Sequence, residues 1–146
     1  MAAVLKMYES AVHEAFNGAV HLDSANNLKM ILMTAYTFDE TDATYTTIKT
    51  DHTEHATANG YTVGGVVVGS VTHVIAPAGV VTFGSASVVW TATGALTAKY
   101  AIAYDVGSDA AIFCIDLDGA GGDVTATDAA FTITDASGWF SIDVSP

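Results

Sequence analysis

Basic residues are scarce in this sequence, and their scarcity excludes several functions. Its 146 residues include four lysines, no arginine and sixteen acidic residues, which gives a formal net charge of -12. Proteins that bind DNA or RNA neutralise phosphates with Lys and Arg and read bases mainly with Arg. We therefore expect no direct binding to nucleic acid and no docking on an anionic membrane surface.

Long apolar runs are also missing, although 51% of the residues are hydrophobic. No stretch approaches the roughly 20 consecutive apolar residues of a membrane span. The first residues, Met1 to Glu9, lack the long apolar core of a signal peptide. We expect a chain that is made in the cytoplasm and has no membrane partner. Its length fits one domain, residues 1–146, which can bury a core without a metal or disulfide.

Cysteine occurs once, so an intrachain disulfide is excluded. Cys114 lies within the apolar segment 111–117. Free cysteine is usually buried, and we interpret Cys114 as a small core hydrophobe. The alternative is a nucleophile, which needs a neighbouring base and some exposure to solvent.

We expect the segment Asn59 to Val68 to be the stretch around which the rest of the fold is organised. Asn59-Gly60 is a strong turn signal because both residues tolerate positive φ. Gly64-Gly65 predicts a bulge or a close approach of another backbone. The three valines that follow favour a pleated, buried surface. We expect this turn to lead into a bulged strand on which the later strands build.

The N-terminal segment, residues 1–18, is predicted to be a short helix or arm. From Leu5 to Asn17, apolar residues recur at spacings of three and four, as on one helical face (Leu5, Tyr8, Val12, Ala15 and Phe16). Asn17-Gly18 is a typical helix stop. A helix this short needs packing to hold it, so we expect it to dock on its own domain. The alternative is an arm that reaches a neighbouring subunit.

The rest of the chain predicts short strands separated by turns. Residues 35–59 are expected to form a long polar surface loop, with a short helix at Tyr45 to His55 as an option. Turn signals, including Pro77-Ala78-Gly79 and Thr93-Gly94, recur at a spacing typical of sandwiches and barrels. The sequence therefore predicts a mainly β protein, an antiparallel β-sandwich of jelly-roll or Greek-key type. The expected strands are Leu28–Thr34, Val66–Ile75, Val80–Phe83, Ser87–Ala92, Leu96–Tyr104, Ala111–Leu117, Ala129–Thr134 and Trp139–Val144.

Two histidines form the best candidate for a metal site. His52 and His55 would share one face of a helix, with Asp51 or Glu54 nearby as an oxygen ligand. The spacing is not the His-Glu-x-x-His pattern of zinc proteases, and the sequence suggests no third protein ligand. A solvated loop explains the same residues, so no metal ligand is assigned.

The segment Asp116 to Asp123 faintly resembles a calcium loop. An EF-hand requires a late bidentate Glu and flanking helices, and both are missing from the pattern. A β-turn rich in Asp and Gly is the alternative. The sequence also lacks a Walker phosphate loop, a Rossmann glycine pattern and a Gly-x-Ser-x-Gly nucleophile elbow. We therefore assign no catalytic or cofactor-binding residue.

Several aromatic residues lie on predicted strands, among them Trp90, Tyr100, Tyr104, Trp139 and Phe140. Large aromatic side chains bury extensive surface and dominate cores. We interpret these five as core residues, and a sugar-stacking platform is the alternative.

Gly60-Tyr61-Thr62-Val63-Gly64-Gly65, then Trp90, then the strand Leu96–Tyr104 form an ordered set. This order resembles a group of small virion proteins of tailed bacteriophages. The resemblance extends from a first segment like Tyr8–Leu22 to an ending like Gly138–Ile142. Lys99 stands where that group commonly has Arg, and the histidine-rich stretch before Asn59 is a second departure.

The resemblance implies a structural protein of the virion with no enzymatic activity and no cofactor. It favours a capsid decoration or cement protein that binds the shell of the major capsid protein. Decoration proteins are often trimers, so a homotrimer is expected. The resemblance also permits a neck, tail or baseplate position. Two other classes stay open: a calcium- or carbohydrate-binding adhesion β-sandwich that uses Asp116 to Asp123, and a hydrolytic site around His52 and His55.

Overall fold

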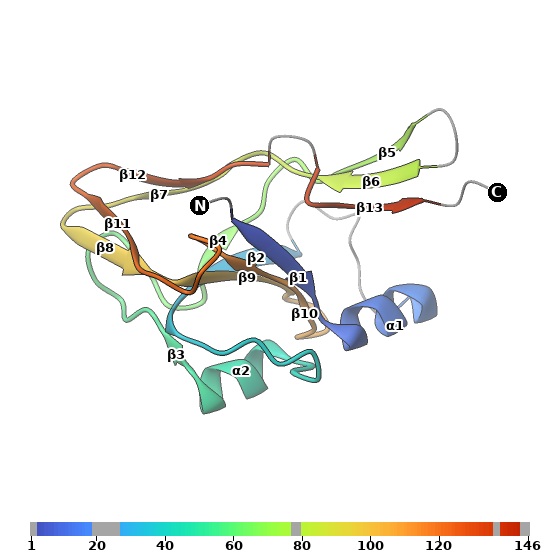
Figure 1. Ribbon diagram of the computed structural model, residues 1–146, viewed down its shortest axis with the longest axis horizontal. Helices are drawn as coiled ribbons and strands as arrows, with labels where there is room; N and C mark the ends of the chain where they lie inside the picture. Colours follow the sequence, from blue (N-terminus) through green and yellow to red (C-terminus); the bar gives the residue numbers. More distant parts are fainter. Residues whose placement is uncertain (1–2, 19–26, 77–79, 136–137, 144–146) are drawn as a thin grey trace.

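The computed structural model shows a mainly β protein with antiparallel sheets stacked as a sandwich and a helix near the N-terminus (Figure 1). This confirms the predicted fold class. The structure describes residues 3–18, 27–76, 80–135 and 138–143. The expected turn at Pro77-Ala78-Gly79 lies outside these ranges. No helix within them is long and apolar enough to cross a membrane.

The main sheet has the strand order β1-β10-β9-β2-β3, and β4 also pairs with β2. Its central strands are buried along nearly their whole length because both faces of the sheet are covered. The strands are β1 (Val4–Met7), β2 (Leu28–Ala35), β3 (Thr53–Glu54), β4 (Val66–Val67), β9 (Tyr100–Asp105) and β10 (Ala111–Asp116).

A long ribbon of two chain segments covers one face of this sheet. Residues 80–98 run antiparallel to the described residues of 124–135 and 138–143, from the pair Val80–Asp143 to the pair Ala98–Val124. Hydrogen bonds continue across the breaks between strands: Ala92 N–H donates to the Ala129 carbonyl at 3.0 Å. The strands are β6 (Val80–Gly84), β7 (Val88–Thr91), β8 (Ala95–Ala98), β11 (Val124–Thr127), β12 (Ala130–Ile133) and β13 (Phe140–Asp143), and β5 (Thr72–Ala76) adds to β6.

The alternation of side chains along β9 explains how the two faces are filled. Tyr100 and Tyr104 point to one face, where their rings meet Tyr36 and Tyr45 at centroid distances of 5.6 and 4.3 Å. Ala101 and Ala103 point to the other face, because successive strand residues alternate. The small alanines leave room for the aromatic side chains of the ribbon (Trp90, Phe131, Trp139 and Phe140).

The N-terminal segment differs from the prediction of a continuous helix from Leu5. Val4–Met7 forms strand β1 and pairs with β10, and helix α1 (Glu9–Asn17) begins only after Tyr8. The helix ends as predicted at Gly18, which has φ +71°. It docks on β10 through the buried Ala11, but it leaves Phe16 exposed. The predicted apolar face was therefore only partly right, because Leu5 belongs to a strand and Phe16 does not reach the core.

The predicted polar loop 35–59 contains regular structure. Helix α2 (Tyr45–Asp51) begins at Thr44, whose side-chain oxygen accepts a hydrogen bond from Thr47 N–H at 3.1 Å. Strand β3 follows at once and pairs with β2. The optional helix at Tyr45 is confirmed, but it ends before His52 and not at His55.

Two predicted strands are each divided between two sheets. Leu96–Tyr104 breaks at Lys99 into β8 in the ribbon and β9 in the main sheet, and Lys99 N–H donates to the Met33 carbonyl. Val66–Ile75 breaks near Ser70, which has φ +52°, into β4 and β5. The second break falls at Gly69-Ser70, a turn signal that the strand prediction passed over, whereas no Gly or Pro marks the first break. The sequence analysis also missed β11.

Candidate functional site

The carboxylate of Glu54 holds the turn Gly60–Gly65 in place. Its Oε1 accepts hydrogen bonds from Tyr61 Oη at 2.6 Å and from Gly64 N–H at 2.7 Å, and its Oε2 accepts one from Tyr45 Oη at 2.9 Å. Tyr61 Oη in turn accepts from Leu32 N–H at 3.2 Å. One carboxylate therefore ties the turn, α2 and the β3 edge of the main sheet together.

The tyrosines around Glu54 are held in their neutral form. Burial is the main cause that raises the pKa of Tyr61 and Tyr45, and the hydrogen bond that each donates to Glu54 raises it further. Burial also raises the pKa of Tyr104 to about 12. A neutral hydroxyl can donate to the carboxylate, whereas a phenolate cannot. This arrangement is a structural anchor and presents no free base.

The glycines of this turn are needed for close backbone contact. Gly65 has φ +69°, and a Cβ added there would lie 1.9 Å from the Met30 carbonyl oxygen. Gly60 has φ +86°, and a Cβ there would lie 2.0 Å from the Thr91 oxygen. The predicted turn and close approach are confirmed. The bulged-strand interpretation was wrong, because Gly64 and Gly65 precede the two-residue strand β4 at the sheet edge and the later strands do not build on it.

The structure does not bring His52 and His55 together as a ligand pair. His52 Nε2 lies 3.7 Å from Asp42 Oδ2, and its ring meets the edge of Tyr36. His55 is buried, packs against Tyr61 and contacts the Ala56 carbonyl through Nδ1 at 2.7 Å. In the described part of the chain, no group of three or more His, Cys, Asp or Glu side chains gathers to hold a metal.

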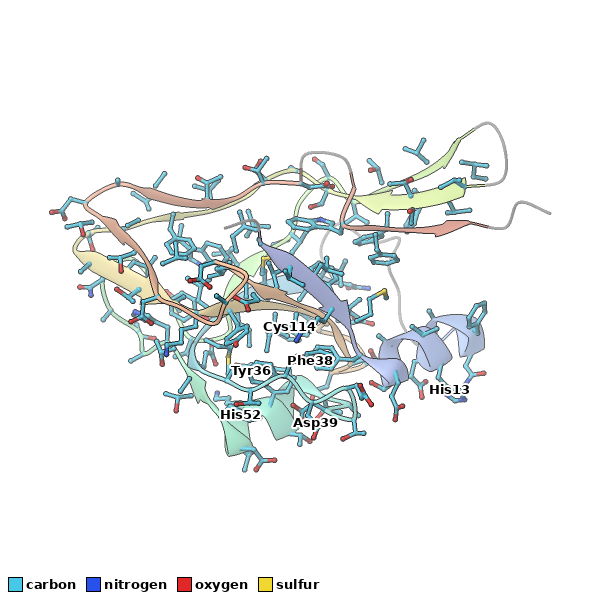
Figure 2. All side chains as sticks on the ribbon, viewed as in Figure 1. His13, Tyr36, Phe38, Asp39, His52 and Cys114 are labelled. Carbon is cyan, nitrogen blue, oxygen red and sulfur yellow. The ribbon has the colours of Figure 1, made fainter. Side chains whose placement is uncertain are left out.

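A chain of polar contacts leads from His52 into the core on the α2 side of the main sheet (Figure 2). Tyr36 Oη donates to Asp42 Oδ2 at 3.0 Å and shares a hydrogen bond of 2.7 Å with Tyr8 Oη. Burial is the main cause that raises the pKa of both tyrosines. Both tyrosine hydroxyls have a protein partner, so this series of contacts stabilises the packing of β1 against the segment before α2.

Cys114 lies at the inner end of this region and is buried, as its sequence context predicted. Burial raises the pKa of its thiol to about 12. A thiol of that pKa carries almost no thiolate near neutral pH, and the thiolate is the reactive form. These properties favour the core interpretation over the nucleophile.

The aspartates of the segment 116–123 bind backbone amides of their own turn. Asp116 Oδ1 accepts from Gly119 N–H at 3.0 Å and from Gly121 N–H at 3.1 Å. Asp118 Oδ1 accepts from the N–H groups of Ala120 and Gly122, which lower the pKa of Asp118. Both carboxylates are thus engaged in closing the turn, as the β-turn interpretation expects.

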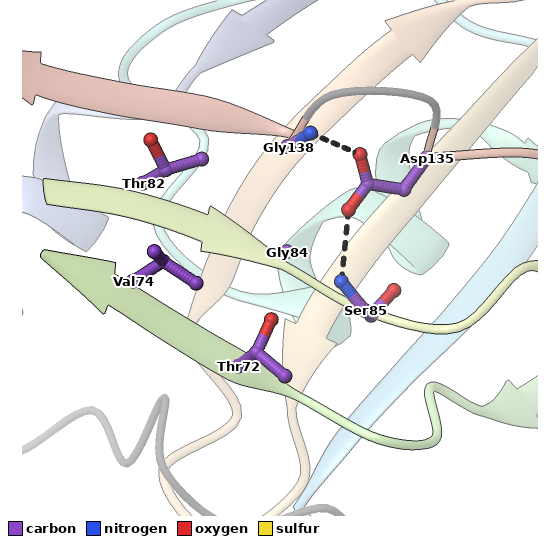
Figure 3. Close-up of a pocket in the computed structure, with 7 residues that line it drawn as sticks. All are labelled: Thr72, Val74, Thr82, Gly84, Ser85, Asp135 and Gly138. Carbon is purple, nitrogen blue, oxygen red and sulfur yellow. Dashed lines mark hydrogen bonds between the residues drawn. The ribbon is translucent and has the colours of Figure 1, made fainter. Parts of the chain in front are cut away.

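A shallow pocket of about 340 Å³ lies on the β5–β6 sheet beside Asp135 (Figure 3). Asp135 accepts hydrogen bonds from Ser85 N–H at 2.9 Å and from Gly138 N–H, so both of its oxygens are occupied. The remaining lining is mostly threonine, valine and glycine. The pocket has no nucleophile paired with a base, and Asp135 serves to join β6 to the turn before β13.

The predicted aromatic residues belong to the core or pack against it. Trp90 and Tyr104 are buried, and Tyr100, Trp139 and Phe140 are partly buried. Trp139 Nε1–H donates to Ser85 Oγ at 2.8 Å, which explains how a partly buried indole is satisfied. No exposed ring platform for sugars forms from these five residues.

Two exposed surfaces carry the features that the sequence analysis missed. The first is the outward side of β7, β8, β11 and β12, which we name the outer face (Val89, Thr91, Ala95, Thr97, Thr125, Thr127, Ala130 and Thr132). The second is the end of the molecule where β5, β6 and β13 extend above α1 (Figure 1). The sequence did contain a signal for uncharged surfaces, because Lys99 is the only charged residue from residue 55 to residue 104.

No protein-family model matches this chain, and no curated protein and no solved structure matches it either.

Proposed function

We propose that this chain is a non-enzymatic structural protein of a bacteriophage virion. It decorates or cements the capsid by binding the shell of the major capsid protein, after synthesis in the host cytoplasm. The polar clusters of the described residues support this role, because their hydroxyls and carboxylates are engaged with one another or with backbone amides. They stabilise the fold and converge on no open cleft.

The uncharged outer face is the observation that carries the proposal. Its side chains are only valine, threonine and alanine, on a chain whose formal net charge is -12. On the same strands Val88, Trp90, Phe131 and Ile133 point inward and are buried. The acidic residues lie outside this set of side chains, and Asp128, in the turn between Thr127 and Ala130, is at its border. A neutral β surface can approach a protein shell without desolvating carboxylates.

The geometry of the outer face suits repeated, weak attachment. Two strand pairs, β7 with β12 and β8 with β11, present short side chains, such as Thr97 and Thr125, whose hydroxyl oxygens lie 2.8 Å apart, and the ribbon bends between the two pairs (Figure 1). A surface of short side chains on paired strands fits another protein surface better than it fits a small molecule. Attachment of many copies to a symmetric shell needs only modest affinity from each copy when the copies are joined to one another.

The number of copies bound to purified virus particles tests the proposal. Val89→Asp places a charge in the outer face, and we expect at least about tenfold fewer copies on purified particles, a change that needs only ~1.4 kcal/mol. Val106→Asp is the matched control, because both valines are 47% exposed and Val106 lies outside the outer face. Equal occupancy of the two variants, each with an unchanged melting temperature, would overturn the proposed attachment.

The number of copies per particle distinguishes between positions within the virion. Hundreds of copies per particle support the capsid shell, whereas a small ring of copies supports the neck, tail or baseplate. Quantitative mass spectrometry of purified particles gives this number against the major capsid protein. Calorimetric titration with Ca²⁺ addresses the adhesion alternative, and heat above dilution would favour it over the virion role.

A further inference from the structure

The two most exposed large apolar side chains among the described residues lie at the same end of the molecule. Phe16 of α1 is 82% exposed and Ile75 of β5 is 79% exposed. At this end, β5, β6 and β13 form a three-stranded sheet that extends beyond the main sheet, and α1 lies below it (Figure 1). Exposed apolar groups that gather in one region mark an interaction surface.

Strand β5 is an open edge with apolar side chains on both faces. It pairs with β6 on one side, and no described strand pairs with its other side. Val74 and Ile75 are neighbours in sequence, so they point to opposite faces, and both are exposed. An edge strand without charge, bulge or cover is a template for pairing with another chain.

The registers show which face Ile75 occupies. His73 lies opposite Phe83, and Phe83 lies opposite Phe140, so these three rings form a row on one face of the sheet. The rings are in contact, with centroid distances of 5.4 and 5.0 Å. Ile75 lies opposite Val81 in a parallel row on the same face, because residues two apart along a strand share a face.

An apolar groove of about 370 Å³ runs between α1 and β13. Its described lining comes from α1, β1, β10 and β13, and includes no residue of β5 or β6. The lining contains no charged side chain (Met7, Ala11, Val12, Ala15, Phe16, Ile112, Phe140 and Ser141). Phe16 stands at this groove largely uncovered.

We propose that β5 of one copy adds, in a second copy, to the edge of β13 with which no described strand pairs, and that Ile75 covers the second copy's groove at Phe16. This single contact buries the two most exposed large apolar side chains among the residues that the structure describes. Both β5 and β13 run antiparallel to β6, so they run parallel to one another. A ring that continues the sheet from copy to copy therefore pairs β5 in parallel with the neighbouring β13.

The distribution of charge favours a second copy of this chain as the partner that pairs with β13 and covers the groove. Each copy carries a formal charge of -12, so copies repel one another wherever carboxylates face each other. Strand β5, Thr72 to Ala76, has no Asp, Glu, Lys or Arg, and its one ionisable side chain is His73. The described lining of the groove has no ionisable side chain, and the only acidic residue of β13 is Asp143 at its end. This contact is thus one of the few that like-charged copies can form without bringing carboxylates together.

The contact joins two different edges, so it is head to tail. Head-to-tail contacts generate a closed ring when the rotation closes. The expectation that the ring contains three copies rests on the proposed virion function, whereas the contact itself rests on β5, β13 and the groove. Failure of the contact can be told apart from failure of the attachment to the shell, because the two surfaces contain different residues and are altered by different substitutions.

Complementation between two variants tests the contact. Ile75→Asp disables the strand side and Phe16→Asp disables the groove side, and light scattering should show each alone as a monomer of 15.0 kDa. A mixture of the two should give a dimer, because Phe16→Asp keeps an intact β5 and Ile75→Asp keeps an intact groove. The unaltered chain and Val106→Asp should both give the mass of a ring, which is three chains for the trimer.

Several outcomes would overturn the inference. One is a monomer at every concentration of the unaltered chain. Another is that each variant alone is monomeric and the mixture is monomeric too. That result would indicate a symmetric contact in which both copies use the same surface, because either substitution would then disable it and mixing would not restore it. A third is that Ile75→Asp or Phe16→Asp alone gives the same oligomeric mass as the unaltered protein. Both substituted side chains are exposed, so folded variants are expected, and circular dichroism checks this.

Discussion

Glu54 and Tyr61 are joined by the shortest of the hydrogen bonds that fix the Gly60–Gly65 turn, 2.6 Å from Tyr61 Oη to Glu54 Oε1. The pair links strand β3 to a turn seven residues later and, through Leu32 N–H, to the central strand β2. Charge-assisted hydrogen bonds of this kind are about twice as strong as neutral ones. The pair therefore explains how an irregular turn is held in one conformation.

Removal of the Tyr61 hydroxyl should destabilise the protein. Tyr61→Phe removes one hydrogen bond that Glu54 accepts and leaves the Leu32 N–H without its acceptor, so we expect a loss of about 1–3 kcal/mol in the free energy of unfolding. Tyr45→Phe is the control, because it removes a single, longer bond of 2.9 Å to the same carboxylate. Urea denaturation measures both, and an equal or smaller loss for Tyr61→Phe would contradict the anchor role.

Gly65 should tolerate no side chain. Gly65→Ala forces a Cβ to within 1.9 Å of the Met30 carbonyl oxygen at positive φ, and we expect a loss of at least about 3 kcal/mol or failure to fold. Gly18→Ala is the matched control, since Gly18 has a similar φ of +71° but nothing within 4 Å of the added Cβ. We expect it to cost only about 1 kcal/mol. Similar melting temperatures for the two variants would contradict the close approach.

Stability should fall in alkali. The structure raises the pKa of all six tyrosines above 10, mainly through burial, and that of Tyr104 to about 12. Above pH 10 the unfolded chain loses phenol protons that the folded chain keeps, so the free energy of unfolding decreases as pH rises. For Tyr104 alone, the contribution lost by about pH 12 is roughly 2 to 3 kcal/mol.

Tyrosinate absorbance and circular dichroism, recorded together against pH, check this prediction. We expect little ionisation near pH 10 in the folded protein, and then ionisation that coincides with unfolding at higher pH. Free model tyrosine in the same buffer is the control. Complete titration near pH 10 with the fold intact would show that the hydroxyls are not held neutral.

Cys114 should react slowly while the chain is folded. Its side chain is buried and its thiol pKa is raised to about 12, so a thiol reagent at pH 8 should modify it at least about 100-fold more slowly than in denaturant. The denatured protein provides the control and should show one reactive thiol per chain. Rapid reaction of the folded chain would favour the nucleophile interpretation.

The sequence predicted some elements closely because the signals for them are local. The expected strand Ala129–Thr134 contains β12 (Ala130–Ile133), whose residues alternate between exposed and buried. The helix stop at Asn17-Gly18 and the turn at Asn59-Gly60 follow from the preference of Gly and Asn for positive φ. Cys114 and Trp90 are buried, as their apolar surroundings suggested.

Other features depended on contacts between distant residues. Nothing near Lys99 in the sequence indicates that the chain leaves the ribbon and enters the main sheet, because that break follows from its bond to Met33. The role of Glu54 was equally hidden: it was considered as a metal ligand beside His52 and His55, whereas it binds Tyr61 and Gly64. Its partners come from the Gly60–Gly65 turn and from α2.

The sequence by itself determined the acidic charge, the alternation of polar and apolar side chains, and the turns that require glycine, because each depends on residues next to one another. Only the tertiary structure decided which strands pair, which carboxylates serve as anchors, and that Phe16 and Ile75 stay exposed at one end of the molecule. The reason is physical: burial and hydrogen-bond satisfaction are properties of packed surfaces, and those surfaces are assembled from segments far apart in the chain.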